Sequence, residues 1–421
     1  MKILLLNQAF YPDVVSTAQH AGDLCARLAG AGHEVNVIAS QRAYDNYRRS
    51  FPRKEVWNGV KIRRIPSLGL GKRALWRRVL DFAWFHFCCM LQLARSPKFD
   101  VVIAMTTPPM IGFVSSFFVR YKGGQLVYWV MDLNPDEAVA AGMLNERSVP
   151  ARILRWMLHS TLRRSSKVIA LDRFMQARLL AKGVDASAVT VVPPWSHDQS
   201  ISYDAKGRAA FRQEHGLEGK FVVMYSGNHS PCHPLDTLMG AALQLAGRPD
   251  IAFCFVGGGT EHARVAAFAS QHGLSNVLCL PYQPIERLSA SLASADLQAV
   301  VMGDAFVGIV HPCKIYNILL LGIPVLYVGP SEGHIPDLVP PEAHSTWFYS
   351  VRHGQVDALV NHIRAAASNS SQRNPEQVCI AARFSTDLLV TKLVTMIETL
   401  GPQGTRIPVA DVIPSTERTS A

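Results

Sequence analysis

The fold class can be inferred from residues 1–40, MKILLLNQAFYPDVVSTAQHAGDLCARLAGAGHEVNVIAS. Residues 3–6 form a short apolar run without charges, which is typical of a buried strand. Residues 17–30 place apolar side chains at helical spacing and lead into Gly30 and Gly32, where a helix is expected to stop. Residues 34–39 again favour a strand. Strand, helix and strand in this order predict a parallel sheet covered by helices.

The same alternation continues along the chain. In the first half we expect further strands at residues 61–65, 101–105, 125–130, 167–171 and 189–192. Pro193 and Pro194, followed by a polar stretch up to Arg208, interrupt the pattern and mark a domain boundary. A second series of strands is expected at residues 221–225, 251–256, 277–280, 297–301 and 324–328.

These patterns predict an α/β protein of two domains, residues 1–195 and 196–400. The chain has 421 residues, of which 48% are hydrophobic, and this is ample material for two packed cores. Residues 401–421 are rich in Gly, Pro, Ser and Thr, and we expect them to form a disordered tail.

The compartment is indicated by the cysteines and the N-terminus. The eight cysteines are scattered and form no CxxC pair, so we expect free thiols in a reducing, cytoplasmic environment. The apolar run that follows Lys2 is too short for the hydrophobic region of a signal peptide.

The positive charge is concentrated between Arg42 and Arg78, where twelve Lys and Arg residues face only two acids. Aromatic residues lie among them, and an apolar helix too short to span a bilayer is expected at residues 79–91. A basic, aromatic segment followed by such a helix favours attachment to an anionic membrane surface. A solvated loop followed by a core helix is the alternative. Nucleic-acid binding is not expected, because no recognition motif accompanies the charge.

The loop after the first strand is the first candidate site. Ligands of a doubly wound sheet bind at the carboxyl ends of its strands, and residues 7–18 occupy that position. Tyr11, Ser16 and Thr17 are its candidate binding residues. The alternative is that Ser16 or Thr17 merely caps the following helix.

Acidic residues follow the strand expected at residues 125–130. Asp132 comes first and is the candidate catalytic residue, whereas Asp136 and Glu137 are explained as acids at a helix N-terminus, where the helix dipole favours them. No histidine lies close by in sequence, so the cluster does not have the pattern of a metal site.

The first strand of the second half ends in a turn that resembles an anion site. Gly227 and Asn228 lead toward a helix start, an arrangement that points backbone N–H groups at a ligand such as a diphosphate. His229 and His233 are candidate additional donors, although a lone histidine is more often structural. A second loop suited to close approach follows the next strand, at Gly257, Gly258 and Gly259.

The fourth candidate is an apolar helix after Pro312 that carries Lys314 and Asn317. Lys314 lies in the first turn, where the helix dipole disfavours a cation, so an anionic ligand would compensate it. A surface lysine with a buried aliphatic stem is the alternative.

Together, these four motifs resemble glycosyltransferase family 4, whose members have the GT-B fold of two Rossmann-like domains facing across a cleft. The resemblance covers roughly residues 1–400. Three stretches resemble the bacterial branch that builds O-antigen, colanic acid and other exopolysaccharides, namely residues 132–136, 225–228 and 312–319. Members of that branch transfer a sugar from a nucleotide-diphosphate donor to a polyprenyl-diphosphate-linked acceptor, with retention and without a metal or other cofactor.

The resemblance implies a role for each candidate. Gly227, Asn228, His229 and His233 would bind the donor diphosphate together with Lys314, while Asn317 would face the donor nucleotide or sugar. The loop Gly257–Gly259 would approach the nucleotide base. Asp132 would lie beside the reacting sugar and the acceptor hydroxyl, and Tyr11, Ser16 and Thr17 would line the acceptor side.

Two departures from the family pattern stand out. Many members carry a Glu-x7-Glu pair in the fourth motif, whereas residues 309–317 contain no carboxylate here. A histidine often precedes the acid of the second motif, and Met131 takes that position here.

The expected partners are a nucleotide-diphosphate sugar, a lipid-linked glycan acceptor and the anionic inner face of the cytoplasmic membrane. A nucleotide-sugar epimerase of the same fold and a non-catalytic sugar-nucleotide or lipid-binding protein are the alternatives. A nicotinamide oxidoreductase is not expected, because the first turn lacks GxGxxG.

Overall fold

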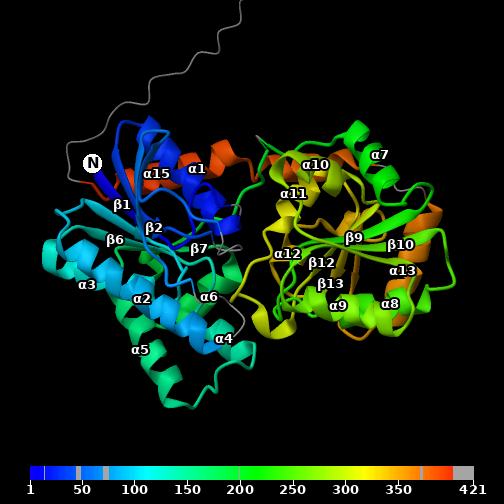
Figure 1. Ribbon diagram of the computed structural model, residues 1–421, viewed down its shortest axis with the longest axis horizontal. Helices are drawn as coiled ribbons and strands as arrows, with labels where there is room; N and C mark the ends of the chain where they lie inside the picture. The colour runs from blue at the N-terminus through cyan, green and yellow to red at the C-terminus, as the bar shows by residue number, and fades with distance from the viewer. Residues whose placement is uncertain (14, 44–48, 70–74, 199, 370–372, 402–421) are drawn as a thin grey trace, which may run out of the picture.

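The computed structural model describes residues 1–13, 15–43, 49–69, 75–198, 200–369 and 373–401. Two lobes lie side by side, each built on one sheet with helices packed against it (Figure 1). The fold is that expected from the sequence, an α/β protein with two parallel-sheet units. Residues 402–421, most of the predicted tail, lie outside the described residues.

The first lobe contains an eight-stranded sheet in the order β3-β4-β2-β1-β5-β6-β7-β8. All neighbouring strands are parallel except β3 and β4. Strand β1 is central and fully flanked, which agrees with its charge-free apolar run. The strands are β1 (Lys2–Leu6), β2 (Glu34–Ser40), β3 (Lys54–Trp57), β4 (Val60–Ile65), β5 (Val101–Ala104), β6 (Gln125–Trp129), β7 (Lys167–Ala170) and β8 (Val189–Val191).

The second lobe contains a six-stranded sheet in the order β11-β10-β9-β12-β13-β14, parallel throughout. Its first strand along the chain, β9, lies between β10 and β12, so the strand order reverses there. Such a switch point is where open parallel sheets bind ligands. The strands are β9 (Phe221–Asn228), β10 (Ile251–Gly258), β11 (Val277–Leu280), β12 (Leu297–Val301), β13 (Val325–Val328) and β14 (Phe348–Val351).

All twelve strands expected from the sequence are present, and each begins within one residue of its predicted start. Two strands were missed. Strand β3 lies inside the basic segment, where its charged residues hide the alternation of a sheet edge, and β14 is only four residues long. Strand β9 continues to Asn228 because Gly227 and Asn228 pair with Gly257 and Gly258 of β10.

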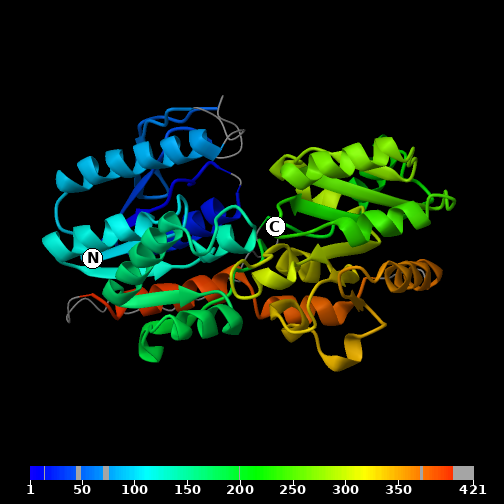
Figure 2. The same ribbon diagram turned by 90° about the horizontal axis from the view of Figure 1, so that it is seen from below.

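The helices of the first lobe form two layers. Helices α2, α3 and α5 pack next to one another, and α2 and α3 lie on the opposite side of the sheet from α15 (Figure 2). Helix α2 contains the predicted apolar segment, and no helix in the described part of the chain is long and apolar enough to cross a membrane. These helices are α1 (Ser16–Gly30), α2 (Leu75–Ala94), α3 (Ile111–Lys122), α4 (Asp136–Ala140), α5 (Val149–Arg164) and α6 (Arg173–Ala181).

Helix α15 (Thr386–Glu398) comes from the end of the chain but packs against α1 of the first lobe. Arg27 forms an ion pair with Asp387 at 2.5 Å, and His33 contacts the Glu398 carboxylate at 2.9 Å. Trp195, in the segment between the sheets, donates to Asp23 of α1 at 2.8 Å. The chain therefore crosses between the lobes twice, and the domain limits at residues 195 and 400 stay a prediction.

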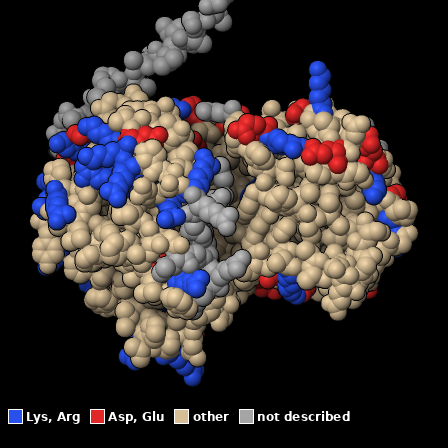
Figure 3. All heavy atoms as spheres, in the orientation of Figure 1, with Lys and Arg blue, Asp and Glu red and all other residues tan. Residues whose placement is uncertain are grey.

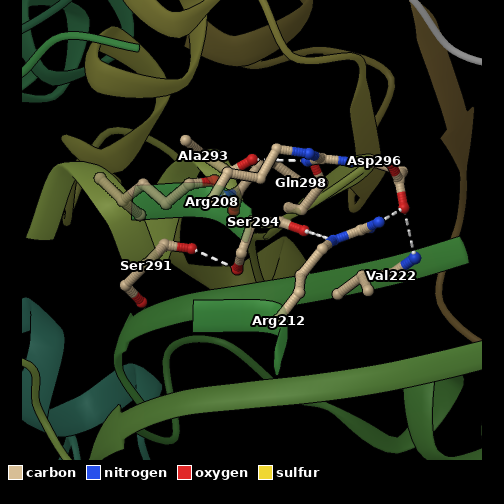
Figure 4. A network of polar contacts seen from close by, with 10 residues as sticks. Arg208, Arg212, Val222, Ser291, Ala293, Ser294, Asp296 and Gln298 are labelled. Carbon is tan, nitrogen blue, oxygen red and sulfur yellow. Dashed lines mark hydrogen bonds and ion pairs between the residues drawn. The ribbon is translucent and has the colours of Figure 1, made fainter. Parts of the chain in front are cut away.

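The remaining helices belong to the second lobe, and a buried polar network ties one of them to its sheet (Figure 4). Arg208 and Arg212 of α7 both pair with Asp296, whose carboxylate also accepts from the backbone N–H of Val222 at 2.7 Å. These helices are α7 (Ala205–Glu214), α8 (Asp236–Gln244), α9 (Thr260–Gln271), α10 (Ile285–Ala293), α11 (Lys314–Leu321), α12 (His334–Asp337), α13 (Val356–Ser368) and α14 (Pro375–Ala382).

This network predicts a stability effect. Asp296→Ala leaves two largely buried guanidinium groups without the carboxylate that balances their charge, so we expect the free energy of unfolding to fall by about 3 kcal/mol. Asp250→Ala is the matched control, because it breaks an exposed Asp–Arg pair with Arg248 and should cost less than about 1 kcal/mol. Urea denaturation followed by circular dichroism measures both, and equal losses would contradict this account.

Candidate active site between the two lobes

Lys314, the first residue of α11, is the central basic residue of the site. Its Nζ atom is buried and has no hydrogen-bond partner in the described structure. Nζ lies 3.4 Å from the ring centroid of Tyr225, which forms a cation–π contact from β9. Burial lowers the pKa of Lys314 well below its usual value. The lysine is therefore held inside the protein without an anion, and the surface-lysine interpretation is wrong.

The ends of β9 and β10 meet beside this lysine. A Cβ atom on Gly227 would lie 3.3 Å from Nζ of Lys314. Gly257 has φ +136°, and a Cβ there would lie 2.0 Å from the Gly227 carbonyl oxygen, so no larger residue fits. Gly258 is the pairing partner of the exposed Asn228, and Gly259 immediately precedes α9. The two glycine loops predicted separately thus form one surface next to Lys314.

His229 and His233 lie beside Lys314 but are not free donors. Burial, and next the charge of Lys314, lower the pKa of each imidazole to about 3, so both are neutral. Nδ1 of His229 donates to the Gly227 carbonyl at 2.9 Å, and its Nε2 has no partner in the described structure. Nδ1 of His233 is also without a partner there. Both histidines lie beside the lysine as expected, and each has one ring nitrogen without a hydrogen-bond partner in the described structure.

Asp132 follows β6 in the first lobe, and its backbone N–H donates to the Thr106 hydroxyl at 3.3 Å. Burial, and next the charge of Glu137, raise the pKa of Asp132 to about 8. Glu137 also has a raised pKa, mainly because of burial. Its carboxylate accepts from the Asn134 amide at 3.1 Å and from the thiol of Cys232, in the second lobe, at 3.9 Å.

Glu137 is therefore more than an acid at a helix start, which is all that the sequence suggested. Asp136 does fit that interpretation, because it begins α4 and pairs with Lys182 at 2.6 Å. Tyr225, Cys232 and Cys313 also belong to the site although none was a candidate. The sequence signal for Tyr225 was its position two residues before Gly227 on the same strand. An aromatic residue in a strand, however, more often belongs to the hydrophobic core.

The acceptor-side candidates are spread over a wider area. Ser16 lies near Cys313 of the second lobe, the residue before Lys314: burial raises the pKa of the Cys313 thiol, and the Ser16 hydroxyl opposes this shift. Tyr11 instead stacks on Trp57 at a centroid distance of 4.2 Å, and Thr17 is half-buried in the first turn of α1. The residue that caps α1 is Val15, without a side-chain bond, so neither Ser16 nor Thr17 caps the helix.

Asn317 lies one turn after Lys314 and faces the linker between the sheets. Its side-chain oxygen accepts from the backbone N–H of His197 at 3.0 Å. This contact fixes α11 against the linker. The predicted contact of Asn317 with the donor nucleotide stays a prediction.

A second polar contact joins the lobes close to the site. His311 donates through Nδ1 to Asp172 at 2.8 Å, and its Nε2 bonds to the hydroxyl of Tyr316 at 2.7 Å. His334 stacks on His311 with ring centroids 3.7 Å apart. Burial alone would raise the pKa of Asp172, but the hydrogen bond from His311 and the attraction of both imidazoles outweigh it and lower the pKa to about 2.

Asp172, His311 and His334 are also the described residues whose spacing could suit a metal ion. Their stacked rings direct the nitrogen lone pairs side by side rather than toward one point, and both nitrogens of His311 are already bonded. We interpret the three residues as a polar contact that holds the two lobes together. The expectation of a metal-independent reaction stays a prediction.

A groove separates the two lobes in the space-filling view (Figure 3). Contacts across the interface lie next to the site residues. The backbone N–H of Leu133, which follows Asp132, donates to the Ile309 carbonyl of the second lobe at 2.9 Å. The first lobe supplies Asp132, Glu137 and Ser16, and the second supplies Lys314 with the glycine loops. Such a site suits a reaction between two ligands, one of them anionic.

Sequence comparisons identify the chemistry. Residues 17–195 match the family model described as a glycosyl transferase 4-like domain. The chain is 26% identical to the putative colanic acid biosynthesis glycosyl transferase WcaI of Escherichia coli K12, over 76% of this chain and 82% of that protein. It is 24% identical to the probable glycosyltransferase WbjE of Pseudomonas aeruginosa, over 58% of this chain and 61% of that protein.

These matches support a glycosyltransferase in which residues 17–195 form a glycosyl transferase 4-like domain. The resemblance inferred from the motifs is thereby confirmed, and the enzyme is a transferase rather than the epimerase or non-catalytic binding protein kept as alternatives.

Solved structures confirm that this glycosyltransferase has the GT-B fold. Sucrose-phosphate synthase from Thermosynechococcus elongatus superposes with a TM-score of 0.72 at 16% identity, covering 95% of this chain and 99% of that one. HepE from Anabaena, crystallised with UDP and glucose, superposes with a TM-score of 0.69 at 17% identity, covering 95% of this chain and 100% of that one.

The raised pKa of Asp132 predicts how stability depends on pH. The folded protein keeps the proton up to about pH 8, whereas the unfolded chain loses it near pH 4, so this group's contribution to stability falls as pH rises between those values. Asp132→Asn mimics the protonated acid. We expect it to become more stable relative to wild type from pH 5 to pH 8, by at most about 1.4 kcal/mol per pH unit.

Denaturation midpoints of the two proteins at pH 5, 6, 7 and 8 measure this trend. Asp136→Asn is the control, because Asp136 is paired with Lys182 and the difference from wild type should stay constant over this range. A constant difference for Asp132→Asn as well would contradict the burial of an acid at this position.

Proposed function

We propose that this glycosyltransferase moves a sugar from a nucleotide-diphosphate donor to a lipid-linked glycan, with retention at the anomeric carbon, in the assembly of a bacterial surface polysaccharide. The observation that carries the proposal is Lys314, whose buried Nζ lacks a partner in the described structure and lies beside the glycine loops at a sheet switch point.

The donor diphosphate fits the second lobe on chemical grounds. Two phosphates need positive charge and backbone N–H groups, and Lys314, Gly227 and the loop before α9 supply both. HepE, a protein of the same fold, binds UDP, which supports placing a nucleotide here.

The reaction needs positioning and help for the leaving group. The acceptor hydroxyl attacks the anomeric carbon on the face from which the nucleoside diphosphate departs, so the configuration is retained. One C–O bond forms as the other breaks, and the hydroxyl proton passes to the departing phosphate oxygen. Lys314 stabilises the charge that develops on this phosphate.

Asp132 is proposed to bind a hydroxyl of the donor sugar or acceptor. Because its pKa is raised to about 8, the carboxyl is protonated near neutral pH and both donates and accepts a hydrogen bond. Burial, and next the like charge of Glu137, keep it in that state. This pair takes the place of the missing Glu-x7-Glu carboxylates as the acidic group of the groove.

The acceptor class rests on the relatives and on the surface of the first lobe. WcaI is named for colanic acid biosynthesis, which supports a polysaccharide product. Helix α2 buries Phe85, Cys89 and Leu93 but exposes a row of large apolar side chains on its outer face, namely Trp76, Val79, Leu80, Trp84, Phe87, Met90 and Leu91. In the same layer, α5 exposes Val149, Ile153 and Trp156.

An apolar surface flanked by arginines suits the interface of an anionic bilayer. Figure 3 shows Lys and Arg gathered on the upper part of the first lobe beside a few acids, and both signs of charge on the second lobe. Arg64 does not contribute, because it is buried and paired with Glu55 at 2.7 Å. We propose peripheral attachment to the cytoplasmic face of the membrane through α2 and α5.

Donor binding tests the central part of the proposal. A panel of nucleotide diphosphates and nucleotide sugars should contain one family that raises the melting temperature of the protein, since a ligand of the folded state stabilises it. Lys314→Ala should abolish the shift and reduce transfer at least 100-fold. Lys206→Ala, which removes an exposed lysine from α7 of the same lobe, is the control.

No shift with any member of the panel, or full transfer by Lys314→Ala, would refute the donor site. Circular dichroism of the variant establishes that the loss does not come from unfolding.

Vesicle binding tests the membrane part. Leu80→Glu with Phe87→Glu places two charges on the exposed face of α2, where both side chains are 48% exposed, so we expect release from vesicles of phosphatidylglycerol and phosphatidylethanolamine. Leu243→Glu, 40% exposed on α8 of the second lobe, should leave pelleting unchanged. Equal pelleting of all three proteins would refute attachment through α2.

A further inference from the structure

Gly227, Tyr225, His229 and His233 surround Lys314, and we call this group the cradle. No anion among the described residues balances the lysine amine in it. Nζ is buried and lacks a hydrogen-bond partner in the described structure, and no ion pair to Lys314 is found there. Its Nζ lies over the face of Tyr225, 3.4 Å from the ring centroid. The lysine also occupies the first turn of α11, where the helix dipole opposes positive charge.

The groups that face Lys314 from the surrounding elements are neutral at physiological pH. From β9, Tyr225 has a pKa raised by burial. The loop after β9 contributes His229 and His233. Nδ1 of His229 carries the proton, because it donates to the Gly227 carbonyl, so its Nε2 is unprotonated. His229 Nε2 and His233 Nδ1 have no hydrogen-bond partner in the described structure. On its own helix, Cys313 is a thiol whose pKa burial raises to about 12.

The nearby acid of the first lobe does not supply the missing charge. Asp132 lies near enough to Cys313, the neighbour of Lys314, to add to the burial that raises the pKa of its thiol. The Asp132 carboxyl itself keeps its proton up to about pH 8. An ammonium buried without a counter-ion is strongly disfavoured and loses its proton instead. The empty cradle therefore holds Lys314 as a neutral amine over part of the neutral to alkaline range.

A diphosphate reverses this balance. It brings two negative charges to the position next to Nζ, which favours the ammonium form and a charge-assisted hydrogen bond. We propose that binding of the donor diphosphate takes up a proton from solvent onto Lys314. The step adds one proton to the amine nitrogen and changes no other bond. It rests on the proposed function of this site as the donor site.

Proton uptake makes donor affinity depend on pH in a defined direction. Below the pKa of Lys314 in the empty protein the lysine is already charged, and affinity is constant. Above that pKa and below the pKa in the complex, affinity falls tenfold for each pH unit. In this way the cradle stays uncharged when empty and becomes charged only with its ligand.

Isothermal titration calorimetry measures the proton directly. The titrant is the member of a panel of UDP-glucose, UDP-N-acetylglucosamine, GDP-mannose, GDP-fucose and dTDP-rhamnose that binds. Sugar diphosphates have no phosphate group that titrates near neutral pH, so any proton taken up belongs to the protein. Binding enthalpies at pH 8 in phosphate, HEPES and Tris, plotted against the ionisation enthalpy of each buffer, give the number of protons.

We expect about one proton per donor bound to wild type and none for Lys314→Arg, because arginine keeps its charge when buried. Lys206→Ala, which removes an exposed lysine of α7 outside the site, is the control and should retain the uptake. Donor binding without uptake in wild type, or uptake that persists in Lys314→Arg, would overturn the proposal. Absence of binding by every nucleotide sugar would instead refute the donor site on which it rests.

Discussion

All strands of a parallel sheet end at the same edge, and this constraint places the site of the protein. In the first lobe, Asp132 follows the end of β6. In the second, Gly227 and Gly257 lie at the ends of β9 and β10, beside the switch point of the sheet. Because the lobes meet along these edges, an acid pair of one sheet comes to face the lysine of the other across a single groove.

The electrostatics of the groove follow from burial more than from pairing. Among the described residues no anion pairs with Lys314, burial drives Asp132 and Glu137 toward their protonated forms, and His229 and His233 are neutral. Groups in this condition are costly to keep unless a ligand uses them. By contrast, the Asp172–His311 contact and the Arg173–Asp337 pair, at 2.9 Å, are fully partnered and hold the lobes together.

The sequence predicted the twelve strands that carry most of both sheets, because apolar runs between turn residues are a local signal. It also identified Gly227, Gly257 and Lys314. The glycines follow apolar strands, and the lysine lies in an otherwise apolar helix. It could not show that Tyr225 lies under Lys314, or that Glu137 faces Cys232, because these contacts join distant segments. The return of α15 to α1 was hidden for the same reason. Strand β3 was lost because its charges obscured the alternation of an edge strand.

The central claim is that Lys314 and the glycine loops bind the donor diphosphate, and a crystal structure with a bound nucleoside diphosphate tests it most directly. We predict phosphate oxygens within hydrogen-bond distance of Nζ of Lys314 and of the backbone at Gly227, with the sugar side of the ligand directed at Asp132. A diphosphate bound elsewhere, with Nζ still covered only by the Tyr225 ring, would contradict the account.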